Sequence, residues 1–304
     1  GTTNVAIGAF ALDANTTASN NTAIGSTALG ANTTGASNTA VGAECLDTNT
    51  TGEQHAALGK NALKANTTGS NSVAIGAGAL RNNTTASNNT AVGTSALNVN
   101  TTGTLNVAVG ANALDANTTA NSNTAIGQNS MTANTTGEEN VAVGRAALQN
   151  NTTASFNTAI GYAAMDANST GAGNVAVGYA AMDANTTSPN NVAVGKNALG
   201  AMTTGSAVGE NTAVGNQSSA AITTGHRNTA LGAYTLDAAT SGNSNTALGW
   251  AALSACTTAT VNTAVGSSAL VAATTGAANV AVGYNALKLN TTGSQNTAVG
   301  SLSL

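Results

Sequence analysis

The side chains that could do chemistry are few and widely separated in this sequence. Its two histidines are His55 and His226, and its two cysteines are Cys45 and Cys256. A metal site or an activated nucleophile needs several such groups within hydrogen-bonding or coordination distance of one another. No motif brings a nucleophile, a base and an orienting group together. We therefore predict no catalytic, metal-binding or cofactor-binding site, and we expect the protein not to be an enzyme.

Carboxylates and glycines give no stronger signal. Only Asp166 and Asp183 are direct neighbours in a series of regularly spaced aspartates, and no Gly-Gly-x-Gly-x-Asp calcium repeat occurs. Gly76-Ala77-Gly78 lacks the third glycine of a nucleotide-binding fingerprint. We interpret the aspartates as a solvated edge, formed by Asp13, Asp47, Asp115, Asp166, Asp183 and Asp237.

All of these residues belong to a tandem repeat that must position them. The motif Asn-(Thr/Val)-Ala-(Val/Ile/Leu)-Gly recurs at a constant interval, with its glycine running from Gly8 to Gly195 and again from Gly215 to Gly300. The step between these two runs is 20 residues, which places a three-residue insertion near residues 206–208. The repeat leaves no room for a linker, so we predict a single repeat array over residues 1–304.

The repeat length decides the fold class. A unit of about 17 residues is too short for a pair of helices, and its motif fits a short strand. Gly, Thr, Asn and β-branched residues also occupy positions at which a helix favours Ala, Leu, Glu or Lys. We predict an all-β fold, a parallel β-solenoid of about 18 coils of 17 residues. Ten coils then separate the histidines and twelve separate the cysteines, so neither pair can share a metal ion or a disulfide.

Equivalent positions of the coils predict the core. The residue before each motif glycine is Val, Ile or Leu, from Ile7 to Val299, and we expect it to point inward with the residue two before it. A second apolar column, four residues after the glycine, begins at Leu12. By alternation, the alanine between the two inward strand residues faces outward.

That alanine occurs in all eighteen units, which a solvent-facing position would not require. Either a second chain packs against it, or the coil is so flat that its own opposite wall does. The first explanation predicts a lateral interface formed by Ala6, Ala23, Ala40, Ala57, Ala74, Ala91, Ala108 and Ala125.

The asparagine of Asn-Thr-Thr is the informative polar position. Later units replace it by Met202, Ile222 and Cys256, which do not suit a solvated site. We therefore predict an inward ladder whose amides bond to the coils above and below. Asn-x-Thr is also an N-glycosylation sequence, but here it arises from the repeat itself. The predicted ladder comprises Asn15, Asn32, Asn49, Asn66, Asn83, Asn100, Asn117 and Asn134.

Composition excludes several partners. Charged residues make up 6% of the chain, the formal net charge is −4, and the seven basic residues are scattered. No basic stripe could therefore neutralise a nucleic-acid backbone. Polar residues interrupt every apolar run before it reaches the length of a membrane span, so we expect no such span.

The stretch Asn71-Ser72-Val73-Ala74-Ile75-Gly76 resembles the YadA-like head repeats of trimeric autotransporter adhesins, and the other units are close variants. The chain is also similar to repeats of phage tail fibres and other bacterial surface fibres. The resemblance covers essentially the whole chain. It implies a left-handed parallel β-roll, homotrimerisation and surface adhesion.

We accordingly expect a non-enzymatic structural or adhesive fibre segment, as part of an extracellular filament, a surface adhesin or a viral fibre. Its partners would be further copies of itself, as a trimer or a head-to-tail filament, and a cell-surface or glycan receptor. Its location would be extracellular, on a cell surface or on a virion.

Two other functions stay open. One is ice binding by a threonine file that includes Thr16, Thr33 and Thr50. The other is carbohydrate binding by a β-helix that stacks sugars on Tyr162, Tyr179, Trp250 and Tyr284.

Overall fold

The computed structural model of the protein describes residues 1–203 and 209–304. The insertion predicted at residues 206–208 lies outside the described residues. The chain divides into two compact units, Gly1–Thr153 and Ala154–Leu304. The described part of the chain contains strands and turns and no helix.

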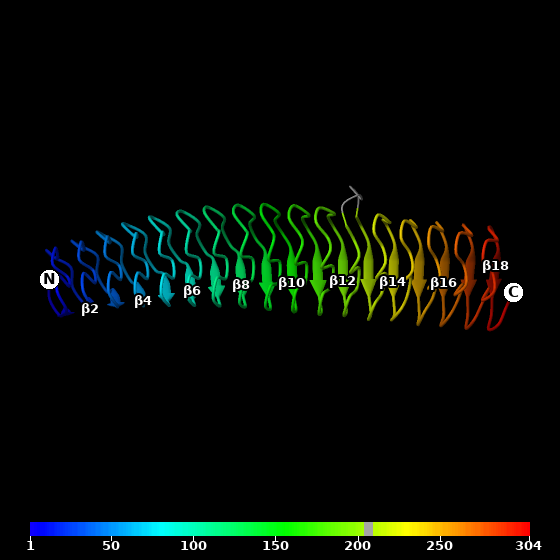
Figure 1. The fold of residues 1–304 in the computed structure, drawn as a ribbon, viewed down its shortest axis with the longest axis horizontal. Coiled ribbons are helices and arrows are strands. Elements are labelled where there is room, and N and C mark those ends of the chain that lie inside the picture. Colours follow the sequence, from blue (N-terminus) through cyan, green and yellow to red (C-terminus); the bar gives the residue numbers. More distant parts are fainter. Residues whose placement is uncertain (204–208) are drawn as a thin grey trace. The chain divides into compact units, whose positions relative to one another are not determined.

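The first unit is a stack of coils, each of which contributes one strand of three residues. Each strand pairs in parallel with the strand of the next coil, and Figure 1 shows the strands of the unit as arrows that point the same way. The strands are β1 (Val5–Ile7), β2 (Thr22–Ile24), β3 (Thr39–Val41), β4 (Ala56–Leu58), β5 (Val73–Ile75), β6 (Thr90–Val92), β7 (Val107–Val109), β8 (Thr124–Ile126) and β9 (Val141–Val143).

The second unit repeats this arrangement. Its strands also pair in parallel and in register, alanine opposite alanine. They are β10 (Thr158–Ile160), β11 (Val175–Val177), β12 (Val192–Val194), β13 (Thr212–Val214), β14 (Thr229–Leu231), β15 (Thr246–Leu248), β16 (Thr263–Val265), β17 (Val280–Val282) and β18 (Thr297–Val299). The predicted all-β fold, a parallel β-solenoid with about 17 residues per coil, is confirmed.

The motif glycine ends each strand. Gly25 has a φ of 133°, which side-chain-bearing residues rarely adopt. A Cβ atom at Gly25 would lie only 2.5 Å from the carbonyl oxygen of Gly42 in the next coil. Glycine at this point therefore allows both the sharp turn and the close approach of successive coils.

Each coil then bends through left-handed residues other than glycine. In the second coil these are Thr27, Leu29 and Ser37, with φ values between 51° and 60°. Leucine is uncommon in this region because its Cβ crowds the backbone. Burial compensates for the strain, because Leu29 is fully buried and its equivalents form the largest apolar column of the core.

The direction of the strand side chains differs from the sequence prediction. The middle residue of each strand from β2 to β18 is the buried one, and the two flanking residues are exposed or half-exposed. Ile24 and its equivalents thus lie outside, although the pattern of apolar residues predicted them inside. The prediction was wrong because it took the most apolar residues to be the inner ones, whereas the narrow coil has room only for alanine there.

Candidate interaction surface

The outer residues of the strands form a surface of unusual composition, which we call the strand surface. It consists of the residues three before and one before each motif glycine. The first of these is Thr, Val or Ala in every coil, and the second is Val, Ile or Leu. Several are strongly exposed, including Leu58 at 48%, Ile126 at 39% and Leu231 at 46%. No member of either position carries a charge. The strand surface is therefore neutral in each unit, and one of its two residues per coil is always apolar.

The alanines predicted as a lateral interface lie elsewhere. Ala23, Ala40, Ala57, Ala74, Ala91, Ala108 and Ala125 are at most 1% exposed within a single chain, so no second chain could reach them. Ala6 is exposed in the first coil. The assignment of this file to a lateral interface was wrong.

The opposite wall of the same coil crowds these alanines, as the second explanation required. The Cys45 thiol donates a hydrogen bond of 3.4 Å to the carbonyl oxygen of Ala57, and the Ser130 hydroxyl donates one of 3.1 Å to that of Ala142. Both donors occupy the position three residues after a motif glycine. The wall that carries this position therefore lies directly against the strand, and larger strand residues would not fit.

The asparagines of Asn-Thr-Thr, which we call the first amide column, lie in the interior. Asn32, Asn49, Asn66, Asn83, Asn100, Asn117 and Asn134 are fully buried, and Asn15 is half-buried. The amide nitrogen of Asn49 donates to the amide oxygen of Asn32 at 2.9 Å, and Asn117 donates to Asn100 at 2.8 Å. Side-chain amides thus bond directly from coil to coil.

Sequence reasoning missed a second amide column, formed by the asparagine that precedes each strand. In it, the Asn38 backbone N–H donates to the Asn21 side-chain oxygen at 2.8 Å. The Asn38 amide nitrogen donates to the carbonyl oxygen of Gly52 at 2.9 Å, and that oxygen also accepts from Asn49 at 3.0 Å. The recurrence of this asparagine at the start of the motif could have predicted the second column. We used the asparagine only to define the repeat and assigned it no hydrogen bonds.

The threonines of the file form hydrogen bonds between successive coils. Thr33 is half-buried, and its hydroxyl donates to the carbonyl oxygen of Thr50 at 3.0 Å. Thr50 donates in the same way to Thr67. The following residue, Thr34, is exposed. The hydroxyls of the file considered for ice binding therefore support coil stacking.

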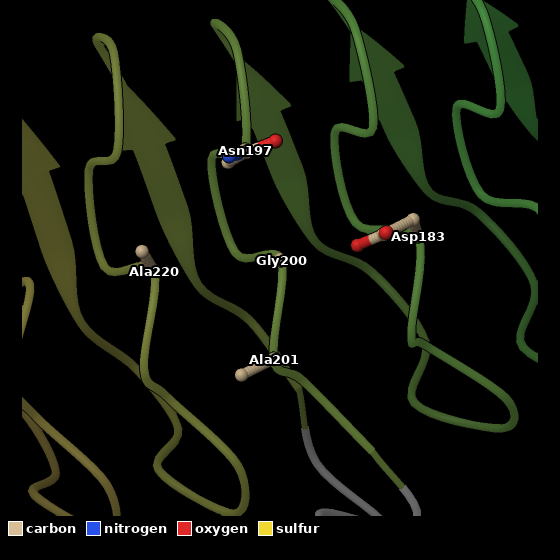
Figure 2. A pocket seen from close by; sticks show the side chains of 5 residues that line it. All are labelled: Asp183, Asn197, Gly200, Ala201 and Ala220. Atoms are coloured by element: carbon tan, nitrogen blue, oxygen red, sulfur yellow. The ribbon is translucent and has the colours of Figure 1, made fainter.

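A shallow hollow of about 310 Å³ lies on the surface of the second unit (Figure 2). It is lined by Asp183, Asn197, Gly200, Ala201 and Ala220. Figure 2 shows the carboxylate of Asp183 directed toward Gly200, where the aspartate column changes to glycine and then to alanine. The hollow exists because these two residues are too small to fill their positions.

The aspartates are partly removed from solvent. Burial raises the pKa of Asp115, Asp166, Asp183 and Asp237, and the charge of Asp166 raises that of Asp183 further. In the first unit, the hydrogen bond and charge of Lys64 lower the pKa of Glu44. These shifts follow from local packing and from the neighbouring charges.

The remaining chemical side chains are dispersed. His55 is buried within the second amide column, and His226 is half-buried in the other unit. Cys45 and Cys256 are free and buried, and burial raises their pKa to about 12 and about 11. Among residues 1–203 and 209–304, no three His, Cys, Asp or Glu side chains form a group that could hold a metal ion.

Exposed tyrosine and tryptophan side chains distinguish the second unit. Tyr162 and Tyr179 stack with their ring centroids 5.4 Å apart, and the amine of Lys196 lies 5.8 Å from the Tyr179 centroid. Tyr234 and Trp250 meet edge to face at 6.5 Å. The first unit contains no tyrosine or tryptophan.

In the described residues, no helix has the length and apolar character needed to cross a membrane. Comparison with models of known protein families finds no match to this chain, and comparison with curated proteins finds no match.

Proposed function

We propose that this chain is a non-enzymatic structural or adhesive fibre segment that binds further copies of itself through the strand surface. The fibre would be an extracellular filament, a surface adhesin or a viral fibre, outside the cell, on its surface or on a virion. The β-solenoid fold is compatible with such a role because it repeats one surface in every coil.

The observation that carries the proposal is the neutral strand surface and its apolar residue in every coil. Soluble monomers rarely expose contiguous apolar patches of more than a few hundred Å², and larger patches mark sites of association. Ile7, Leu58 and Leu231 are each more than 45% exposed, and every coil adds a Val, Ile or Leu at the same position. Covering this surface would remove those side chains from water at a gain of about 25 cal/mol per Å².

A second copy of the chain is the simplest partner of matching chemistry. Its strand surface is also neutral, so association would leave no charge buried without a partner. The partner would meet the same side chains at the same spacing in every coil, which suits a symmetric homo-oligomer. The resemblance to trimeric adhesin heads favours three copies joined through the strand surface. The other arrangement is a head-to-tail filament, which would join terminal coils and not the strand surface.

Substitution of the strand surface tests this proposal. Val92→Lys with Ile126→Lys places two charges on it in coils that are not neighbours. The control is Thr85→Lys with Thr119→Lys, which adds the same charges at two exposed threonines outside the strands. We expect light scattering to show an oligomer for the parent and the control, and a single chain for the strand variant, with similar circular dichroism for all three. A monomeric parent, or a control that dissociates equally, would refute self-association through this surface.

A further inference from the structure

Two exposed aromatic side chains in the second unit stand at matching positions. Trp250 is 58% exposed and Tyr284 is 57% exposed, and each directly follows a motif glycine. They lie two coils apart, which corresponds to roughly 10 Å at the usual spacing of paired strands. That distance is comparable to the length of two linked pyranose rings.

The space between these rings is not filled by another large side chain. Ser267 occupies the equivalent position of the intervening coil and is half-buried. Tyr234 packs edge to face against Trp250, with an interplanar angle of 74°, and so restricts the indole. A fixed Trp and an accessible Tyr therefore flank a small hydroxyl-bearing residue.

The other aromatic pair of the unit is arranged differently. Tyr162 and Tyr179 stack almost parallel, at an interplanar angle of 14°, and Lys196 lies over the Tyr179 ring. Their facing surfaces are covered by each other, so this pair stabilises the stack of coils. It provides a natural control for the first pair.

The chain between Trp250 and Tyr284 carries no charge. No Asp, Glu, Lys or Arg occurs from residue 238 to residue 287. A nucleic acid or an acidic polysaccharide would find a single cation, the exposed Lys288 four residues after Tyr284, to balance its charge. The region complements a neutral ligand that has apolar faces for the rings and hydroxyl groups at its edge.

We propose that Trp250 and Tyr284 bind a neutral polysaccharide. The C–H faces of two pyranose rings would lie on the indole and phenol rings, and the Ser267 hydroxyl would hydrogen-bond to the sugar between them. This inference deepens the proposed fibre function, because it names the class of ligand to which an adhesive fibre would bind.

The test uses Trp250 as its own reporter, because it is the only tryptophan of the chain. Cellohexaose, chitohexaose and laminarihexaose are titrated into the full chain, and heparin serves as the charged probe. We expect a saturable change of tryptophan emission with at least one neutral hexaose and none with heparin. Tyr284→Ala should weaken that binding about tenfold, whereas Tyr162→Ala with Tyr179→Ala should leave it unchanged.

Three results would overturn the proposal: no emission change with any neutral hexaose at millimolar concentration, binding of heparin alone, or equal effects of Tyr284→Ala and the stacked-pair variant. Light scattering of the parent and of each variant reports self-association separately from glycan binding. A monomeric parent that still binds a hexaose would refute self-association alone, and an oligomeric parent that binds none would refute the glycan site alone.

Discussion

The two units fill the same buried positions with different chemistry. In the first unit, the first amide column is asparagine in every coil, from Asn15 to Asn151. In the second unit, that column keeps asparagine at Asn168, Asn185 and Asn290. Between them it changes to Met202, Ile222, Ala239, Cys256 and Ala273, all of them fully buried. The second amide column shows the reverse. His55 and Ser72 interrupt it in the first unit, whereas every coil of the second unit has asparagine there.

The hydrogen bonds compensate for this exchange. Where the first column is apolar, the amide of Asn228 donates both to the Asn211 side-chain oxygen at 3.1 Å and to the carbonyl oxygen of Gly242 at 2.8 Å. Asn245 makes the corresponding pair of bonds. The comparison teaches that each unit keeps one column with asparagine in every coil, and that either column can supply it. In the first unit this column forms a continuous ladder of amide bonds from Asn32 to Asn151. An amide ladder fixes the alignment of successive coils because its bonds are directional, whereas apolar contacts alone are not.

The largest expected effect comes from a charge in the unbroken ladder of the first unit. The Asn117 amide donates to the Asn100 side-chain oxygen and to the carbonyl oxygen of Ala120. Asn117→Asp would replace that donor by a carboxylate that faces two acceptors, so we expect a loss of about 3 kcal/mol. Thermal unfolding by circular dichroism measures it, and the loss should shrink at low pH as the buried acid takes up a proton.

Asn117→Met is the matched control, because Met202 occupies the same column. The Ala120 carbonyl keeps its bond from Asn106, but two ladder bonds are lost, because Asn100 loses its donor and the Asn134 amide loses its acceptor. Both remaining groups are neutral, so we expect a loss of between about 1 and about 2 kcal/mol. Equal melting temperatures for the Asp and Met variants would contradict a buried amide ladder, because a buried carboxylate should be more destabilising than a methionine.

A smaller effect is expected when an amide enters the apolar run of the second unit. Ile222→Asn would remove buried volume and leave the new amide oxygen without a donor from Ala239, at a cost of about 2 kcal/mol. Adding Ala239→Asn supplies that donor and should recover about 1 kcal/mol in a double-mutant cycle. Ile222→Met should be nearly neutral. An additive cycle would mean that amides in this column do not bond between coils.

The smallest effect concerns the interruption of the second column. His55 is 2% exposed, with Nε2 2.7 Å from the carbonyl oxygen of Gly69, and its Nδ1 accepts from the Ser72 N–H. Burial lowers the pKa of His55, so the folded state binds fewer protons than the unfolded state. Its contribution to stability is therefore complete above a pH of about 6.5 and declines as the pH falls below that value.

His55→Asn restores the residue found at the neighbouring positions of the column and removes this titration. We expect the stability difference between about pH 7.5 and about pH 5 to shrink by at most about 2 kcal/mol, the linkage limit for one proton. Chemical denaturation at both pH values measures it. The same pH dependence in parent and variant would contradict the role given to the buried imidazole.

The period of the repeat was sufficient to predict the fold. Eighteen copies of one pattern act as an internal comparison, and a unit of about 17 residues admits a strand but no helix pair. The inward orientation of the first amide column could also be inferred, because Met202, Ile222 and Cys256 occupy it. A position that accepts both amide and apolar groups is one that solvent does not reach.

The orientation of the strand could not be predicted in the same way. Alternation shows that Ala23 and Ile24 face opposite sides, but it does not say which side is the interior. Hydrophobicity favoured isoleucine, whereas the width of the coil favoured alanine, and that width depends on the opposite wall. The invariance of the alanine was the better signal, since steric limits are stricter inside a narrow coil than on its surface.

The exact recurrence of bonded atoms in successive coils also bears on how such a gene can change. Asn49 bonds to Asn32 through the same two atoms that join Asn66 to Asn49. Unequal recombination that removes one whole repeat within a unit therefore joins two coils whose partner atoms already match. We therefore expect the gain or loss of a whole coil within a unit to preserve these bonds. An exposed residue such as Trp250 can be copied to a new place in the array by the same event.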